Sequence, residues 1–164
     1  METRKIALGS SVAALYALGV ILFAPISFLV FQVRVADALI PLSIIFGMPV
    51  VQGVTLGNII ANIYGQLGYV DIIGGSIANF LAAYIGWKIG SMKFTGSYFV
   101  ASIAQNIVVS SIVGSYLAIL FEVPLEVGFL GILLGSTISM NMIGFILVLT
   151  LEKSSLAKDN LART

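Results

Sequence analysis

Hydrophobic positions in this chain form long runs, which are separated by short groups of glycine, proline and polar residues. An α-helix needs about 20 consecutive apolar residues to cross a hydrocarbon core about 30 Å thick. The runs predict helices at roughly 6–24, 35–46, 49–64, 70–87, 97–121 and 124–151. We therefore expect an all-α integral membrane bundle of six transmembrane helices. Five is the alternative, because the run at 35–46 is shorter than a bilayer crossing.

Prolines mark several of the predicted boundaries. Pro25 is expected to end the first helix, since proline cannot donate the backbone hydrogen bond of a continuing helix, and an extended segment follows at 26–33. Pro41 should kink the second helix, whereas Pro49 suits the first position of the third. We expect the segment 26–33 to form a lid over the outer end of the bundle.

Composition supports the membrane class and narrows the chemistry. Hydrophobic residues make up 59% of the chain, charged residues only 9%, and the mean hydropathy is +1.11. These values lie far outside the range of soluble domains, so we expect a single transmembrane domain over 1–164. The chain has no cysteine and no histidine. Thiolate and imidazole metal sites, disulfides and Cys-His or Ser-His nucleophiles are therefore excluded, and no enzyme is predicted.

Basic residues predict the orientation of the bundle. Seven of the eight fall before the first predicted helix, after the fourth and after the sixth: Arg4, Lys5, Lys88, Lys93, Lys153, Lys158 and Arg163. In a six-helix protein these positions share one face, which the positive-inside rule makes cytoplasmic. Both termini are then cytoplasmic and the protein lies in the cell membrane. The outer face carries Arg34, Asp37, Asp71, Glu122 and Glu126.

Polar residues also gather near the predicted outer ends of the helices. Thr55, Asn58 and Asn62 are spaced three and four residues apart, so they share one face of the third helix. Charged side chains are costly in a bilayer and tend to pair or to line a site. Amides, carboxylates and a guanidinium together suit a flat molecule with polar edges. We therefore predict a substrate-binding site at Arg34, Asp37, Asn58, Asn62 and Asp71, with Phe28, Phe31, Tyr64 and Tyr69 as candidates for stacking.

Each of these residues also has a structural interpretation. Asp71 is placed to cap the fourth helix and to complement its dipole. Arg34 and Asp37 are three residues apart and can form a local ion pair. Asn58 and Asn62 can join neighbouring helices, as amides in membranes often do. A structural role is the expectation for four further amides: Asn79, Gln105, Asn106 and Asn141. Small residues form stripes on other helical faces, which predict close packing within the bundle and, on the first helix, a surface for a partner protein.

The stretch from Arg34 to Ser76 resembles the QueT family of membrane-embedded substrate-binding components of energy-coupling factor transporters. The likeness lies in Arg34-Val35-Ala36-Asp37-Ala38-Leu39, Gly57-Asn58-Ile59-Ile60-Ala61-Asn62, Gly65, Gly68, Asp71-Ile72 and Gly75-Ser76. The remainder matches in size and hydropathy. The family's Ala-x-x-x-Ala coupling pattern in the first helix looks like Ala13 and Ala17.

This resemblance implies a six-helix protein that captures a 7-deazaguanine, a queuosine precursor, at its outer face. It also implies docking on a transmembrane coupling subunit that is driven by two ATPase subunits. The chain itself has no Gly-x-x-x-x-Gly-Lys-Ser/Thr loop for nucleotide phosphates. No cofactor and no nucleic-acid partner are implied. If the ligand carries an aminomethyl cation, Asp37 or Asp71 is the expected counter-charge.

Three alternatives remain open from the sequence. The same architecture can bind another vitamin or nucleobase. An ion-coupled carrier or small channel would use Asp37 and Asp71 as proton or sodium sites. A membrane scaffold would need no ligand site, and would tolerate alanine at Arg34, Asp37 and Asn62.

Overall fold

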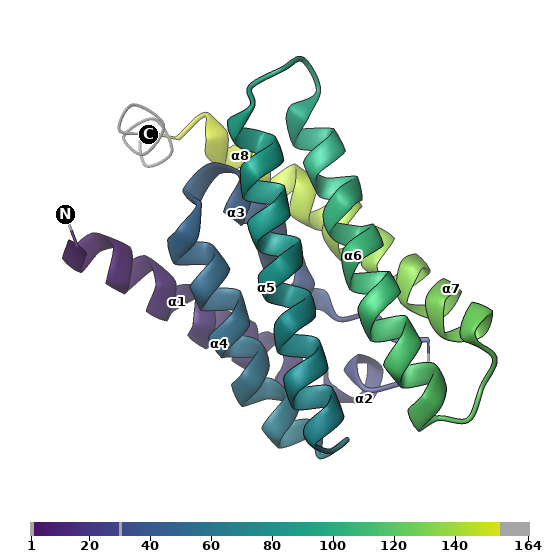
Figure 1. Ribbon diagram of the computed structural model, residues 1–164. Coiled ribbons are helices and arrows are strands. Elements are labelled where there is room, and N and C mark those ends of the chain that lie inside the picture. Colours follow the sequence, from purple (N-terminus) through teal and green to yellow (C-terminus); the bar gives the residue numbers. More distant parts are fainter. Residues whose placement is uncertain (1, 30, 155–164) are drawn as a thin grey trace.

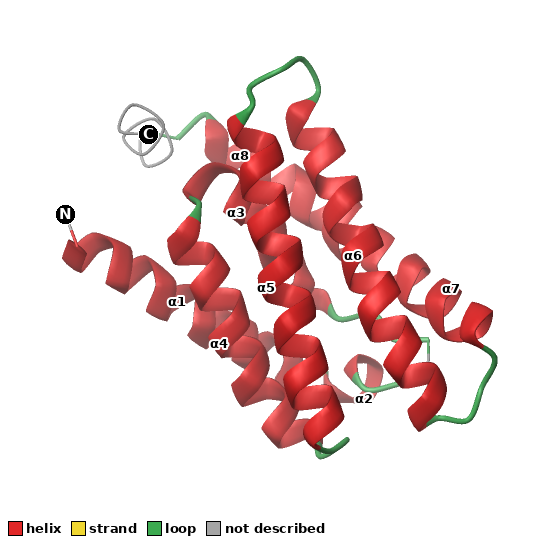
Figure 2. Ribbon diagram, viewed as in Figure 1, coloured by secondary structure: helices red, strands yellow, loops and turns green. Residues whose placement is uncertain are grey.

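The computed structural model describes residues 2–29 and 31–154, and this part of the chain is helical with no strand (Figure 2). The helices are α1 (Glu2–Leu22), α2 (Ala24–Ser27), η1 (Val35–Leu42), α3 (Ser43–Phe46), α4 (Met48–Gly65), α5 (Tyr69–Ser91), α6 (Ser97–Leu120), α7 (Leu125–Ser136), η2 (Thr137–Gly144) and α8 (Phe145–Glu152). The predicted all-α class is thereby confirmed.

Four helical segments of the described residues are long and apolar enough to cross a membrane. They are α1, α5, α6 and the continuous rod Leu125–Glu152. The segment Val35–Phe46 is apolar but shorter than a crossing, and α4 has 18 residues that include Gln52, Asn58 and Asn62. The protein is therefore a multi-pass membrane protein. Of the six predicted crossings, the second is too short and the third, α4, is too polar to be counted by length and hydropathy.

The first helix ends earlier than predicted. α1 stops at Leu22, and Pro25 lies inside the short helix α2 instead of terminating the first span. Proline is tolerated in the first turn of a helix, because the backbone N–H that it lacks would have no partner there. The first residues of the segment predicted as extended, Ile26 and Ser27, therefore belong to α2. The two ends of that segment are close together, because Val33 N–H donates to the Ile26 carbonyl at 3.0 Å.

The second predicted helix is correct in place but not in form. Val35–Leu42 is a 3₁₀-helix, which continues as the short α-helix α3. Pro41 explains the change, because its ring and missing N–H oppose α-helical bonding with the preceding turn. Gly47 follows with a φ of +66°, a conformation that suits glycine, and turns the chain into α4.

The last span is one rod, but it is not a uniform α-helix. Thr137–Gly144 winds as a π-helix between α7 and α8. A β-carbon added at Gly144 would lie 2.8 Å from the Ala38 carbonyl oxygen and from the Pro41 ring, so this turn packs directly on η1. π-helical turns are rare and are seldom visible in a hydrophobic pattern.

Small residues set the packing of the long helices. α1 packs along α4, α4 on α5, α5 on α6 and α6 on α7 (Figure 1). A β-carbon at Gly53 would lie 2.7 Å from the Gly9 carbonyl oxygen, and one at Gly57 2.7 Å from that of Ala13. Gly114 and Gly128 meet in the same way between α6 and α7. The predicted packing role of the small-residue stripes is confirmed.

Candidate functional site

The five predicted site residues lie together in the interior of the bundle. Each is at most 5% exposed: Arg34, Asp37, Asn58, Asn62 and Asp71. They come from the segment before η1, from η1 itself, from α4 and from the start of α5. Three more polar side chains complete the group: Tyr16 of α1, Asn79 of α5 and Tyr116 of α6. We call these eight residues the polar cluster. It lies in the half of the bundle near the α4–α5 turn.

The Tyr16 hydroxyl is the meeting point of four helical segments. It donates to Asp37 Oδ1 at 2.5 Å and lies 3.4 Å from Asn58 Oδ1, while Asn79 Nδ2 donates to it at 2.8 Å. Tyr16 itself is fully buried in α1. Buried polar groups are costly without partners, so these contacts fix α1, η1, α4 and α5 relative to one another.

Arg34 bonds to an amide and not to the nearby carboxylate. Its Nη1 donates to Asn58 Oδ1 at 2.8 Å, and its guanidinium carbon lies 5.4 Å from the centre of the Phe28 ring. Asp37 instead accepts from Tyr16. The hydrogen bonds therefore do not support a local Arg34–Asp37 pair, and the Phe28 ring lies over the guanidinium at a cation–π distance.

Asp71 is tied to α6. Tyr116 donates to Asp71 Oδ1 at 2.8 Å, and Asn62 Nδ2 donates to the Asp71 backbone carbonyl at 2.8 Å. The N-cap position of α5 is Gly68, and no side chain caps that end. The capping part of the Asp71 interpretation is therefore wrong, but Asp71 does lie in the first turn of α5, where a carboxylate complements the helix dipole. The bond from Asn62 joins α4 to α5, as the structural interpretation of the amides expects.

Several buried polar atoms of the cluster have no hydrogen-bond partner. The donors are Arg34 Nε, Arg34 Nη2 and Asn58 Nδ2, and the acceptors are Asn62 Oδ1 and Asp71 Oδ2. Native proteins satisfy most of their buried polar atoms, so this concentration in one place makes the cluster the candidate site. The cluster offers unpaired donors on Arg34 and Asn58 and unpaired acceptors on Asn62 and Asp71.

Gly75 forms the wall beside both amides. A β-carbon there would lie 2.7 Å from Asn62 Nδ2, 2.8 Å from Asn58 Nδ2 and 3.4 Å from the Tyr116 hydroxyl. Only glycine leaves this face of α5 free for the polar groups of α4 and α6.

The remaining candidates fall outside the cluster. Thr55 shares the predicted polar face, but its hydroxyl donates to the Val51 carbonyl of its own helix at 2.8 Å. Tyr64 and Tyr69 are 56% and 84% exposed, and Phe31 is 61% exposed, so the predicted stacking role is not supported for them. Of the aromatic candidates, Phe28 alone contacts a site residue in the described part of the chain.

The sequence interpretation did not place Tyr16, Tyr116 and Asn79 in the site. Asn79 was expected to be structural, and its bond to Tyr16 is consistent with that role. The two tyrosines lie in apolar helices, where an aromatic residue is normally interpreted as part of the hydrophobic core. For Tyr16 the sequence offers one signal of burial. It lies four residues from Val12 and from Val20, on the buried face of α1.

Ala13 and Ala17, the predicted partner-docking residues, are 8% and 6% exposed. Ala13 contacts Gly57 of α4 through its backbone. The surface of α1 is instead formed by neighbours such as Leu15 and Leu18, which are 59% and 55% exposed. A direct docking contact therefore does not follow from this structure, and the partner role of the two alanines remains a prediction.

A second polar group lies between α6 and the last rod. Asn106 donates to Asn141 at 2.5 Å and to Thr137 at 3.0 Å, and Asn141 donates to Ser102 at 2.8 Å. Gln105 donates to Ser43 at 3.0 Å. These bonds fit the structural role expected for Gln105, Asn106 and Asn141.

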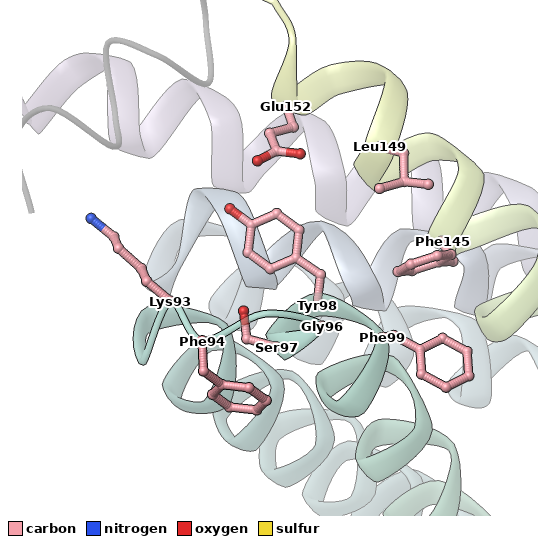
Figure 3. Close-up of a pocket in the computed structure, with 9 residues that line it drawn as sticks. All are labelled: Lys93, Phe94, Gly96, Ser97, Tyr98, Phe99, Phe145, Leu149 and Glu152. Atoms are coloured by element: carbon pink, nitrogen blue, oxygen red, sulfur yellow. The ribbon is translucent and has the colours of Figure 1, made fainter.

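A pocket of about 510 Å³ lies near the other end of α6, away from the polar cluster (Figure 3). Its lining comes from the α5–α6 loop, the first turn of α6 and α8: Lys93, Phe94, Gly96, Ser97, Tyr98, Phe99, Phe145, Leu149 and Glu152. None of the predicted site residues contributes to it. The pocket shows that the α5–α6 loop and the end of α8 meet at the same end of the bundle.

The profile of a family described as QueT transporter matches residues 6–153. That range covers nearly the whole chain and includes every residue of the polar cluster. The match confirms the resemblance found between residues 34 and 76, and extends it over the regions that agreed only in size and hydropathy. No curated protein and no solved structure matches the chain.

Proposed function

Because this chain belongs to the QueT transporter family, we propose that it is the substrate-binding component of an ATP-driven energy-coupling factor importer. We further propose that it captures a queuosine precursor, a 7-deazaguanine, at the polar cluster. The family establishes a transporter in a lipid bilayer with a small-molecule substrate. The precursor, the coupling subunit and the two ATPase subunits are our proposal.

The observation that carries this proposal is the set of unpartnered polar atoms in the cluster. Arg34 and Asn58 present free donors, while Asn62 and Asp71 present free acceptors. A 7-deazaguanine has a carbonyl oxygen and N–H groups on the edges of a flat ring, so it matches both sets. Phe28, which lies over the Arg34 guanidinium, supplies an apolar ring beside them.

Energy for transport has to come from partner subunits in this proposal. The chain lacks the Gly-x-x-x-x-Gly-Lys-Ser/Thr loop that would bind the phosphates of ATP. α1 is the element we expect to contact the coupling subunit. Ala13 would contribute by holding α1 close to α4, since its backbone meets Gly57, and Ala17 is buried on the same helix.

We also propose that the protein lies in the cell membrane with both termini in the cytoplasm. The pocket in Figure 3 brings Lys93 near Glu152, the last residue of α8 and the neighbour of Lys153. Basic residues of two separate segments thus share one end of the bundle, as the positive-inside rule requires. Lys158 and Arg163 lie outside the described residues.

Direct calorimetry on the purified protein in detergent tests the substrate. We expect saturable binding of a 7-deazaguanine and none of unrelated vitamins. Binding of a different vitamin would overturn the substrate while keeping the importer, and well-folded protein that binds none of these compounds would overturn the capture role.

Uptake into proteoliposomes tests the coupling. We expect uptake only when the transmembrane coupling subunit, the two ATPases and ATP are all present. Uptake by this chain alone, driven by a proton or sodium gradient, would favour the ion-coupled carrier.

A further inference from the structure

The pocket in Figure 3 lies where two membrane-crossing segments end. α6 begins at Ser97 and the last rod ends at Glu152, and both segments are long and apolar enough to cross a membrane. The ends of such helices lie at the boundary between the hydrocarbon core and the headgroups. The pocket is therefore at the level of the lipid headgroups, and no residue of the polar cluster lines it.

Two opposite charges line this pocket from separate segments. Lys93 belongs to the α5–α6 loop, and Glu152 is the last residue of α8. Their charged groups lie apart in Figure 3, and the Tyr98 hydroxyl points toward the Glu152 carboxylate. A carboxylate can accept several hydrogen bonds, so Glu152 can bind an ammonium group while it faces Tyr98. The pocket thus offers one place for an anion and one for a cation.

The loop that carries Lys93 has a defined backbone. Lys93 N–H donates to the Gly90 carbonyl at 3.3 Å, and Ser97 N–H donates to the Phe94 carbonyl at 2.9 Å. The side chain of Ser97 is 4% exposed, so the start of α6 is packed into the bundle. The exposed Lys93 side chain therefore extends from a fixed position at the edge of the pocket.

The apolar part of the pocket continues toward the membrane interior. The rings of Phe99 and Phe145 meet edge to face, with their centres 5.9 Å apart. Phe99 is 56% exposed and Leu149 is 42% exposed, so both present apolar surface to the lipid. At 1.5 Å per residue, Phe145 lies about 10 Å below Glu152 along the rod. A molecule with a charged head and an apolar chain can therefore contact both parts at once.

We propose that this pocket binds a phospholipid with an ethanolamine headgroup. Its phosphate would lie at Lys93, its ammonium group at Glu152, and the start of one acyl chain along Phe145. The cavity of about 510 Å³ is in the range of small-molecule sites, about 300–1,000 Å³. This lipid site is separate from the polar cluster, so it does not depend on which small molecule is transported.

The carboxylate selects among phospholipids. Basic residues near a membrane surface attract anionic lipids in general, and Lys153 follows Glu152 in the chain. An anionic headgroup in this pocket would, however, meet the negative charge of Glu152. A choline headgroup carries a positive charge but has no N–H to donate to the carboxylate. Ethanolamine has both the charge and the donors, and we therefore expect it to be preferred.

Native mass spectrometry on the delipidated protein in detergent tests the site. The probes are dioleoyl phosphatidylethanolamine, phosphatidylglycerol and phosphatidylcholine at equal concentrations, so only the headgroup differs. We expect the ethanolamine lipid to be retained at least about tenfold more strongly than the other two, as hydrogen bonds to a charged group would give. Equal retention of the three lipids, or preference for phosphatidylglycerol, would overturn the proposal.

Glu152→Gln tests the contact with the ammonium group. The variant keeps the size of the side chain but removes its charge, so we expect it to abolish the preference for ethanolamine over choline. Glu126→Gln is the matched control, because it removes the same charge from the first turn of α7 and does not line this pocket. A preference that survives in Glu152→Gln, or that is lost equally in both variants, would overturn the role of Glu152.

Lys93→Gln tests the contact with the phosphate, which the three lipids share. We expect it to weaken retention of the ethanolamine lipid about tenfold. Lys88→Gln is the control, because it makes the same charge change near the same end of α5 while its ammonium group lies 4.6 Å from the centre of the Trp87 ring. Melting temperatures show that the variants are folded, and equal weakening in both would mean attraction by surface charge alone and would overturn the site.

Discussion

Gly75 has no room for a side chain, because the amides of Asn58 and Asn62 already occupy the space beside it. A β-carbon there would approach both Asn58 Nδ2 and Asn62 Nδ2 to within 2.8 Å. These atoms are ends of flexible side chains, so the bundle can tolerate a methyl group while the amides must turn away. We expect Gly75→Ala to fold and to bind ligand at least about tenfold more weakly, because hydrogen bonds of the site are lost.

Calorimetry with a melting curve checks this prediction. Gly9→Ala is the control, since its β-carbon would meet the Pro49 carbonyl oxygen at 3.1 Å, away from the cluster. Wild-type affinity in Gly75→Ala would show that the amides do not contact the ligand.

Tyr16 gives a second prediction at the scale of the residue. Tyr16→Phe removes the hydroxyl that pairs with Asp37 and Asn79, so it leaves both groups buried without that partner. We expect the free energy of unfolding in detergent to fall by about 1–3 kcal/mol. Reversible denaturation measures this value. Tyr64→Phe, at a 56% exposed position, is the control and should change the free energy of unfolding by less than about 0.5 kcal/mol. An equally small change in Tyr16→Phe would refute the role of Tyr16 in holding the helices together.

The polar residues of the site were predictable, but their partners were not. Arg34, Asp37 and Asp71 are costly in a membrane, so the sequence alone marks them as candidates, and the spacing of Asn58 and Asn62 places those two on one face. Tyrosine carries no such cost, and Tyr16 and Tyr116 therefore look like core. The hydrogen bond from Arg34 to Asn58 instead of Asp37 depends on how η1 lies against α4, which local spacing does not encode.

At the scale of the element, length and hydropathy predicted where helices lie better than how they are wound. α5 and α6 match their predicted spans within a few residues, because long apolar runs have one favourable structure in a bilayer. η1 and η2 depart from the α-helix where they meet, at Pro41 and Gly144. Pro41 accounts for η1 locally, whereas the π-helix of η2 packs on a segment about 100 residues earlier in the chain, which no local pattern reveals.

The α1–α4 contact gives a prediction at this scale. Gly57 faces the Ala13 carbonyl oxygen and the Tyr16 β-carbon, where an added β-carbon would lie within 2.8 Å of both. A larger residue must push the two backbones apart. We expect Gly57→Val to lower the free energy of unfolding by about 1–3 kcal/mol, and to weaken ligand binding because Asn58 is the next residue.

Denaturation in detergent and calorimetry measure the two effects. Ile60→Val, at a position that is 52% exposed, is a control that should change stability by less than about 0.5 kcal/mol. Unchanged stability in Gly57→Val would contradict close contact between the helices.

At the scale of the whole molecule, the absence of cysteine allows the orientation to be measured directly. We expect Lys93→Cys, in the α5–α6 loop, to react with a membrane-impermeant maleimide only from the cytoplasmic side. Glu126→Cys, in the first turn of α7, should react only from outside. Intact cells and inverted vesicles provide the two sides, and labelling of both positions from the same side would contradict the proposed topology.

α1 and α4 come close at Gly53 and Gly57, where the main-chain oxygens of Gly9 and Ala13 lie beside the first side-chain atoms of Val12 and Tyr16. Side chains can change rotamer and absorb small shifts, but a backbone contact cannot. A shift of α1 along α4 would therefore meet backbone atoms at Gly57, and Asn58 of the polar cluster is the next residue in the chain. We expect a change in the α1–α4 contact to alter the position of Asn58.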